Sequence, residues 1–543
     1  MHTPSRRHLI TAGPLAGAAA SLPRAARAQA DTRPVLTIAV QQILSSNTLE
    51  PLREQSNVGT RIANFYLESM IEQNLQGNLE SVPGLATEWK RIDDRVVELK
   101  LRPGVRFHNG DEMTADDVVF SFGPERMFGI GEVSARPMFT AVVGGDTKDL
   151  PPEVRAIAKR FWPDFEKVEI IDKHSLRFVN KVADVTLEGK LARTGSQIIS
   201  RRAFEEAKTW LDWARRPIGT GPYRIVDFKP DNSITFDAFD AYWGGRPPVR
   251  QIRLLAVPEV AGRINGLVSG QYDFACDIPP DLIGEIEKHP RYEVVGGLIT
   301  NHRLLCFDKN HPELKDPRVR RALTHAIDRQ LIVDTLWAGR TRVPKGLQWE
   351  FYGEMYHADW DVPKYDPALA KQLLREAGYR GGVIPFRVLN NYYTNQVATS
   401  QILVEMFRAV GVATEISMKE NFGQIFDRSS ARGVRDWSNS ALFNDPVSSI
   451  TAQHGPRGQQ QQIGEWTNEE MNQLSPELES STDRARRRAV FRRMLEICER
   501  DDPAYTVLHQ SALFTGKRKD IAWKPAPSFA MDFRTQNLKF GRG

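Results

Sequence analysis

The chain has 543 residues and a mass of 61.4 kDa, which is too long for a single hydrophobic core and indicates two to four domains. Hydrophobic residues make up 41% and charged residues 26%, a balance that excludes the disordered and integral membrane classes. The formal net charge is +5, so the position of the basic excess decides whether an anionic partner is implied.

Residues 1–30 have the pattern of an export signal. Arg6 and Arg7 precede an apolar stretch over residues 9–20, which is too short to span a bilayer. We expect cleavage after Ala30 and a periplasmic location. The arginine pair predicts the twin-arginine route, with an ordinary secretory signal as the alternative. The segment holds four arginines and no acidic residue, so its removal leaves 69 basic against 68 acidic residues. At a net charge of +1, the charge gives no reason to expect nucleic-acid binding.

The rest of the chain has no apolar run of the 18–20 or so residues that a membrane helix needs. Its three cysteines are Cys276, Cys306 and Cys498. A chain of this length folds without disulfides, so buried free thiols are one interpretation, and a Cys276–Cys306 disulfide is the other.

Strand-like and helix-like segments alternate, which predicts an α/β fold. Residues 97–101 alternate apolar and charged side chains, as in a half-buried strand. Thr114 and Asp117 then form a capping box that opens a helix. Strands are expected at 224–228 and 233–236, after the turn at 219–223.

The second half is rich in helix signals. Asp316, Asp328 and Asp366 are expected N-caps, and the helices that follow the last two end at Gly339 and Gly378. Residues 484–500 carry apolar side chains at helical spacing beneath an arginine-rich face, which favours an amphipathic, solvated helix over a nucleic-acid contact. Residues 458–462 are predicted to be a loop.

The sequence contains no P-loop, HExxH, CxxC or GxSxG motif, and its eleven histidines are dispersed. We therefore predict no catalytic residues, no metal and no cofactor.

Several motifs resemble those of the extracellular solute-binding proteins of family 5, the dipeptide-, oligopeptide- and nickel-type receptors of ABC importers. They occur in the family's order across nearly the whole chain after the leader: 83–89, 99–110, 114–118, 219–223, 316–329 and 365–379. The resemblance implies a two-lobed periplasmic binding protein fold of type II with an extra domain and a ligand cleft between the lobes. Lobe I would comprise residues 31–65, 195–270 and 491–543, the additional domain 66–194, and lobe II 271–490. Two crossing segments would form the hinge.

The same resemblance implies a receptor that captures a solute by lobe closure and delivers it to an ABC permease; we expect it to act as a monomer. Peptide receptors of the family hold the ligand's ammonium with a carboxylate a few residues before an Asp-Pro or Glu-Pro step. Here Leu442 takes that position. Asp445 could replace the carboxylate, or it opens a turn with Pro446. A buried ammonium needs a partner, so an opine, a sugar conjugate or an oligosaccharide rivals a peptide as the solute.

Polar and aromatic side chains near the expected cleft are candidates for ligand contact, with core packing or turn capping as the alternative for each. The predicted ligand-binding residues are Ser45, Ser46, Asn47, Asn301, His302, Trp349, Tyr392, Tyr393, Trp437, Asn439, Ser440, Leu442, Asn444 and Asp445. From a different class, a secreted hydrolase with an unrecognised carboxylate pair is the competing hypothesis.

Overall fold

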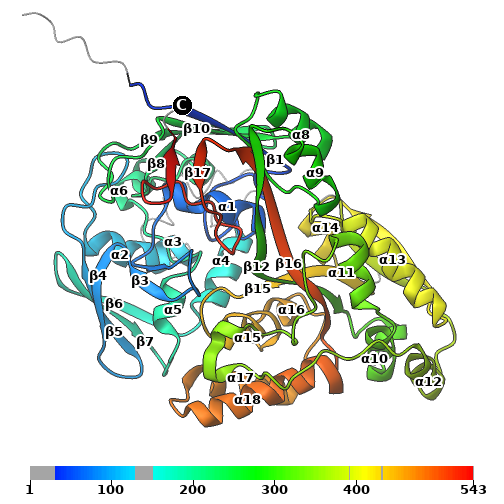
Figure 1. Ribbon diagram of the computed structural model, residues 1–543. Helices are drawn as coiled ribbons and strands as arrows, with labels where there is room; N and C mark the ends of the chain where they lie inside the picture. The colour runs from blue at the N-terminus through cyan, green and yellow to red at the C-terminus, as the bar shows by residue number, and fades with distance from the viewer. Residues whose placement is uncertain (1–30, 129–150, 391, 430–431, 542–543) are drawn as a thin grey trace, which may run out of the picture.

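The computed structural model describes residues 31–128, 151–390, 392–429 and 432–541. The predicted export signal and the predicted cleavage site after Ala30 lie outside these ranges. Two long strands, β12 and β16, run side by side through the middle of the molecule (Figure 1). A four-stranded sheet lies on one side of them, and the helices α10 to α13 lie on the other. The chain is α/β, as predicted.

The main sheet has ten strands in the order β14-β13-β15-β12-β16-β11-β1-β10-β9-β8. The strands β1, β10 and β11 pair in parallel, as do β13, β14 and β15, whereas β12 and β16 are antiparallel to each other. Their bounds are Val35–Val40 (β1), Tyr223–Lys229 (β8), Ser233–Ala238 (β9), Gln251–Ala256 (β10), Phe274–Ala275 (β11), Tyr292–Phe307 (β12), Ile384–Leu389 (β13), Thr414–Lys419 (β14), Val434–Ser440 (β15) and Tyr505–Arg518 (β16).

The strands β12 and β16 join the two halves of this sheet. The second half of β12 pairs with β15, while the last residues of β16 pair with β11. The β12–β16 register shifts between Leu298 and His302, where the backbone N–H of Thr300 instead donates to the carbonyl of Pro527 at 2.8 Å. Gly296 has φ +126°, and a Cβ there would lie 2.0 Å from the carbonyl oxygen of Leu513. The close approach of β12 and β16 at this position therefore requires glycine. The pairing of β12 with β16 is thus irregular between Leu298 and His302.

One hydrophobic core joins β1 and β8–β10 to the four-stranded sheet β4-β5-β7-β6. The predicted strand at 97–101 is β5, whose Val97, Leu99 and Leu101 are buried, and the capping box of Thr114 and Asp117 opens α2 as expected. This half comprises α1 (Asn57–Tyr66), β2 (Ile71–Gln73), β3 (Ser81–Pro83), β4 (Ala86–Arg91), β5 (Val96–Leu101), α2 (Ala115–Phe122), α3 (Pro124–Phe128), α4 (Pro152–Phe161), β6 (Phe165–Asp172), β7 (Ser175–Asn180), α5 (Leu187–Leu191), α6 (Arg201–Glu206), α7 (Trp210–Arg215), β17 (Ile521–Trp523) and β18 (Leu538–Phe540).

Two further hydrophobic clusters fill the other half. Asp316, Asp328 and Asp366 each accept a hydrogen bond from the first turn of their helix, and Gly339 and Gly378 have the positive φ of helix ends, as predicted. The helices are α8 (Val260–Val268), α9 (Ile283–Glu287), α10 (Pro317–His325), α11 (Arg329–Trp337), α12 (Pro367–Ala377), α13 (Gln396–Ala409), α14 (Phe422–Phe426), α15 (Ile450–His454), α16 (Gln459–Gln462), α17 (Glu469–Ser480) and α18 (Arg484–Glu496).

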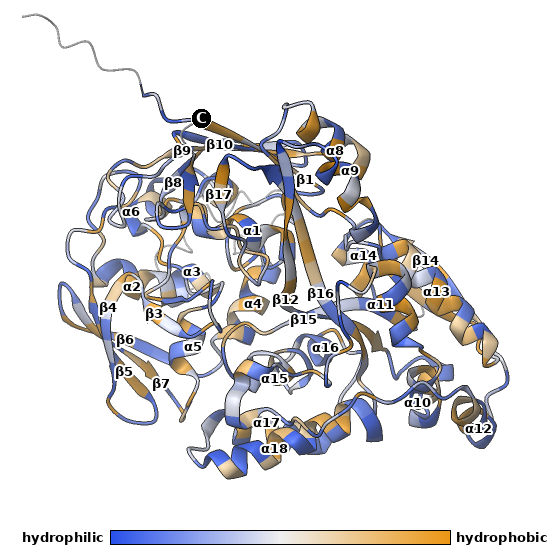
Figure 2. Ribbon diagram, in the orientation of Figure 1, coloured by the Kyte–Doolittle hydropathy of each residue, from blue (hydrophilic) through white to orange (hydrophobic). Residues whose placement is uncertain are grey.

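Helix α18 is amphipathic, with hydrophobic and hydrophilic residues interleaved along it (Figure 2). Phe491 and Met494 are buried in the third cluster, and Arg486, Arg492 and Arg493 form surface ion pairs with acidic residues. The helix therefore has the solvated arginine face that the sequence predicts. The expected lobe boundary at residue 490 falls inside this helix, and the domain limits stay a prediction.

The structure corrects one local prediction and decides between two alternatives for the cysteines. The predicted loop at 458–462 forms the short helix α16, because the Gln460 side chain is buried and donates hydrogen bonds to the carbonyls of Phe307 and Ala504. Cys276 and Cys306 are free and buried, so the disulfide alternative is not formed. Within the described ranges, no helix has the length and apolarity to cross a bilayer.

Candidate functional site

A cleft of about 1010 Å³ opens between segments far apart in the sequence. Its walls come from the loop before α1, from α4 and the residue stretch around α5, and from β15 with α14 to α17 (Figure 1). These are parts of all three predicted domains. Both apolar rings and charged side chains line it.

The first wall is built around a buried carboxylate. Glu54 lines the cleft and accepts hydrogen bonds from the backbone N–H groups of Ser45 and Ser46 at 3.0 and 2.7 Å, and from that of Ser56 at 3.1 Å. Burial raises the pKa of Glu54, while these hydrogen bonds oppose the shift. Ser45 lines the cleft, and its buried hydroxyl has no hydrogen-bond partner among the described residues.

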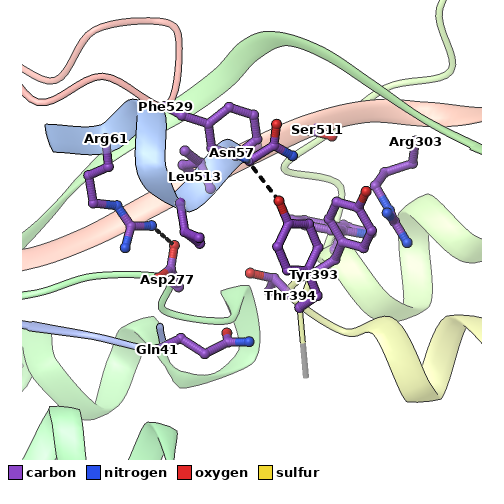
Figure 3. Close-up of a pocket in the computed structure, with 14 residues that line it drawn as sticks. Gln41, Asn57, Arg61, Asp277, Arg303, Tyr393, Thr394, Ser511, Leu513 and Phe529 are labelled. Atoms are coloured by element: carbon purple, nitrogen blue, oxygen red, sulfur yellow. Dashed lines mark hydrogen bonds and ion pairs between the residues drawn. The ribbon is translucent and has the colours of Figure 1, made fainter. Parts of the chain in front are cut away.

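Tyr392 and Tyr393 follow β13 and face the first wall. The hydroxyl of Tyr392 accepts a hydrogen bond from the backbone N–H of Asn57, the first residue of α1, at 2.9 Å (Figure 3). Tyr393 donates to the Ser438 hydroxyl at 3.1 Å, and the Arg303 guanidinium lies 3.4 Å from the centre of its ring. Behind the two tyrosines is a small cavity of about 40 Å³. Tyr392 thus bridges the two walls, whereas Tyr393 contacts residues of its own side.

The third wall is β15 and the chain after it. Trp437 lines the cleft, packs against Phe422 and Phe426, and has a buried Nε1–H without a hydrogen-bond partner. Ser440 and Leu442 also line the cleft. Leu442 therefore presents a hydrocarbon side chain where the family resemblance led us to look for a carboxylate.

The structure brings half of the predicted ligand-binding residues to this cleft: Ser45, Ser46, Tyr392, Tyr393, Trp437, Ser440 and Leu442. Their role in binding stays a prediction. The other seven lie elsewhere, each for an identifiable reason.

Four of the seven are amide or imidazole side chains with neighbours of their own. Asn47 accepts a hydrogen bond from Arg53 at 3.2 Å. Asn301 and Asn439 are each 1% exposed; the first donates to the Ser440 hydroxyl at 2.9 Å, and the second donates to the Ser449 carbonyl at 3.3 Å. His302 is buried in β12, and burial holds its pKa well below the usual range.

The remaining three lie in the core, on the surface or in an ion pair. Trp349 is buried and stacks on His302, with ring centres 4.2 Å apart. Asn444 is exposed outside the cleft. Asp445 caps the turn Pro446–Ser448 and accepts two 2.9 Å hydrogen bonds from Arg487, so it is the turn-opening residue of the two alternatives.

The sequence analysis missed Glu54, Arg160, Arg193 and Gln459, all of which line the cleft. The sequence offered one signal for Glu54, since it precedes the helix N-cap Ser56 by two residues and could bond to its backbone. The two arginines have no local signal, because the fold alone brings α4 and the segment after α5 together.

Comparison with known proteins agrees with this architecture. Residues 80–457 match the model of the bacterial extracellular solute-binding proteins, family 5 Middle. The di/tripeptide-binding protein 2 of Pseudomonas aeruginosa is 26% identical, over 92% of this chain and 95% of its own. The heme-binding protein A of Haemophilus influenzae is 29% identical, but over only 56% of this chain and 55% of its own length. The periplasmic binding protein DppA of Helicobacter pylori, solved with the peptide STSA, superposes with a TM-score of 0.79 at 18% identity, covering 94% of this chain and 98% of that one.

These findings define the class: the chain has the two-lobed fold of the periplasmic binding proteins. It belongs to the bacterial extracellular solute-binding proteins of family 5, because the family match spans more than half of its length. The resemblance drawn from the sequence is therefore confirmed.

Proposed function

We propose that the protein is the periplasmic receptor of an ABC importer, which captures a peptide or peptide-like solute by lobe closure and delivers it to the membrane permease. The observation that carries the proposal is the cleft of about 1010 Å³, lined by all three predicted domains, among them β15, which pairs with β12. A cleft of this size holds a solute of several residues or sugars. We propose β12 and β16 as the hinge.

Contacts across the cleft supply the energy of closure. Besides the Asn57–Tyr392 hydrogen bond, the Asn57 amide donates to the Ser438 hydroxyl at 3.2 Å. An ion pair at 2.7 Å also joins Arg457, which follows α15, to Asp164, which follows α4. A solute that touches both walls favours the closed shape over the open one by its extra contacts, and the permease can recognise that shape. This mechanism needs no covalent chemistry, so we propose a receptor rather than a hydrolase.

A non-peptide solute, such as an opine, a sugar conjugate or an oligosaccharide, is the second candidate. Leu442 cannot pair with an ammonium, and Asp445 is already paired with Arg487. The unpartnered Ser45 hydroxyl and Trp437 Nε1–H suit hydroxyl and amide groups.

The test is to identify the solute that co-purifies from the periplasm by mass spectrometry, then to measure its effect on thermal unfolding of the solute-free protein. Binding to the native state alone raises the melting temperature. A panel of peptides, opines and oligosaccharides that leaves the melting temperature unchanged would argue against a receptor role. Turnover of any of them, abolished by single Asp or Glu substitutions, would favour the hydrolase.

A further inference from the structure

Two arginines sit together on one wall of the cleft. Arg160 is in the last turn of α4, and Arg193 follows α5. Both line the cleft, and their guanidinium carbons lie 5.0 and 3.9 Å from the centre of the same ring, that of Phe161. The Phe161 ring therefore contacts two guanidinium groups at one wall of the cleft.

Neither arginine forms an ion pair with the described residues. Arg193 is 6% exposed; it donates from Nη2 to the Phe161 carbonyl at 2.9 Å, and its Nε has no hydrogen-bond partner. Arg160 makes its ring contact with Phe161 and no hydrogen bond to any residue that the structure describes. The two guanidinium groups repel each other, and the charges of Asp184 and Glu479 oppose this effect only in part at Arg193, whose pKa stays lowered.

The other cationic side chains of the cleft are already paired. Arg53 pairs with Glu153 at 3.5 Å, Arg457 with Asp164 at 2.7 Å, and Lys190 with Glu479 at 3.3 Å. Of the remaining groups, Glu54 is occupied by the backbone N–H groups of its own loop. Arg160 and Arg193 are thus the cationic side chains of the cleft that have no ion pair within the described part of the chain.

Burial lowers the pKa of Arg160 to about 10 and that of Arg193 to about 9, and the charge of Arg160 adds to the second shift. Both side chains stay protonated near neutral pH. Buried charges are usually paired, because desolvation without a partner is costly. An anion placed between them would relieve both the desolvation and the repulsion.

We propose that Arg160 and Arg193 form an anion subsite that binds a carboxylate of the solute. The proposal builds on the receptor function above and narrows its solute class to acids. Guanidinium groups match a carboxylate in geometry, since their parallel N–H donors meet its two oxygens. The carboxylate could be the C-terminus of a peptide or the acid group of a non-peptide solute such as an opine, and the experiment separates these sources.

The direct probe is glutarate, with the neutral glutaramide as its matched control. We expect millimolar glutarate to raise the melting temperature of the full, solute-free protein and glutaramide to leave it unchanged. In Arg160→Gln, Arg193→Gln and the double variant, the apparent affinity for glutarate should fall at least tenfold. Arg53→Gln, which removes a cleft arginine already paired with Glu153, should keep the wild-type affinity. Circular dichroism of each variant checks that it folds, and the half-buried Arg160 supplies a variant with little risk to the core.

The subsite is overturned by an equal response to glutarate and glutaramide, or by a glutarate response that survives in the double variant. Absence of any glutarate response in the wild type overturns it as well. Trialanine and trialanine amide then identify the source. If the protein binds trialanine more tightly than trialanine amide, and the double variant loses this preference, the subsite binds a peptide C-terminus. If the protein responds to glutarate but does not distinguish the two peptides, the subsite binds the acid group of another solute.

The proposed subsite and the proposed receptor function can be refuted independently of each other. A solute panel that binds and closes the lobes while glutarate gives no response would contradict the subsite alone. A glutarate response confined to the intact arginine pair, together with a panel that never causes closure, would contradict the receptor function alone.

Discussion

Replacing Asp445 by alanine tests whether this carboxylate stabilises the fold or binds the solute. Its Oδ1 accepts a hydrogen bond from the Val447 N–H at 3.0 Å, and both its oxygens accept from Arg487 at 2.9 Å. The two side chains are 16% and 9% exposed. The substitution removes a cap and leaves the Arg487 guanidinium largely buried without its carboxylate.

The expected cost follows from that burial. Breaking a buried ion pair by removing one partner costs about 3–5 kcal/mol, because the remaining charge is left desolvated. Asp316→Ala is the matched control: Asp316 also precedes a proline, caps a helix and pairs with an arginine, but Arg318 and Asp316 are 43% and 29% exposed. An exposed pair contributes about 0–1 kcal/mol and an N-cap about 1 kcal/mol, so the control should lose about 1–2 kcal/mol.

Urea unfolding followed by circular dichroism measures both losses, and calorimetric titration with the identified solute measures affinity. We expect Asp445→Ala to lose more stability than Asp316→Ala while both keep the wild-type dissociation constant. Arg487→Met in the Asp445→Ala background should recover part of the loss, because it removes the stranded charge. Equal losses in the two alanine variants, or a tenfold weaker solute affinity in Asp445→Ala alone, would refute the assignment of Asp445 to the fold.

Three further predictions concern closure, pH and export. Tyr392→Phe removes the hydroxyl that accepts from Asn57 across the cleft, at a cost of about 1 kcal/mol to the closed state, so calorimetry should show about fivefold weaker solute binding. His454 is buried and its pKa is about 3, below that of the unfolded chain, so the folded state resists protonation. Its contribution to stability falls by about 1.4 kcal/mol per pH unit as the pH drops below about 6.5, and His454→Asn should flatten urea-unfolding stability over that range by this amount. Mass spectrometry of the exported protein should find Asp31 at its N-terminus, and Lys in place of Arg6 and Arg7 should block export.

Each of these has a defined contrary result. Tyr379→Phe, which removes a hydroxyl bonded within one loop to the Gly382 carbonyl, is the control for closure; equal effects of the two tyrosine variants would contradict the cross-cleft role. An unchanged pH slope in His454→Asn would mean that this imidazole is protonated in the folded protein. Export that survives the paired lysine substitution would favour the ordinary secretory route.

Much of the fold was predictable because its signals are local. The caps at Thr114, Asp316, Asp328 and Asp366 depend on bonds within three residues, so the sequence alone specifies them. The order of motifs along the chain predicted the family. The helix α16 was missed because the Gln460 side chain that anchors it donates to carbonyls more than 40 residues away.

Three of the predicted residues at the cleft come where a strand ends. Tyr392 and Tyr393 come directly after β13, and Ser440 ends β15, so their side chains reach the cleft. Asn301 and His302 lie inside β12, which has a strand on either side, and packing with neighbours buries both. Sequence spacing does not reveal the register that decides this. Arg160 and Arg193 are brought together only by the tertiary fold.

Small-angle X-ray scattering of the solute-free protein, before and after addition of its co-purifying solute, tests the central claim most directly. The account predicts a smaller radius of gyration in the presence of solute, since the two lobes close on it. A radius of gyration that stays the same at saturating solute would contradict a receptor that works by lobe closure.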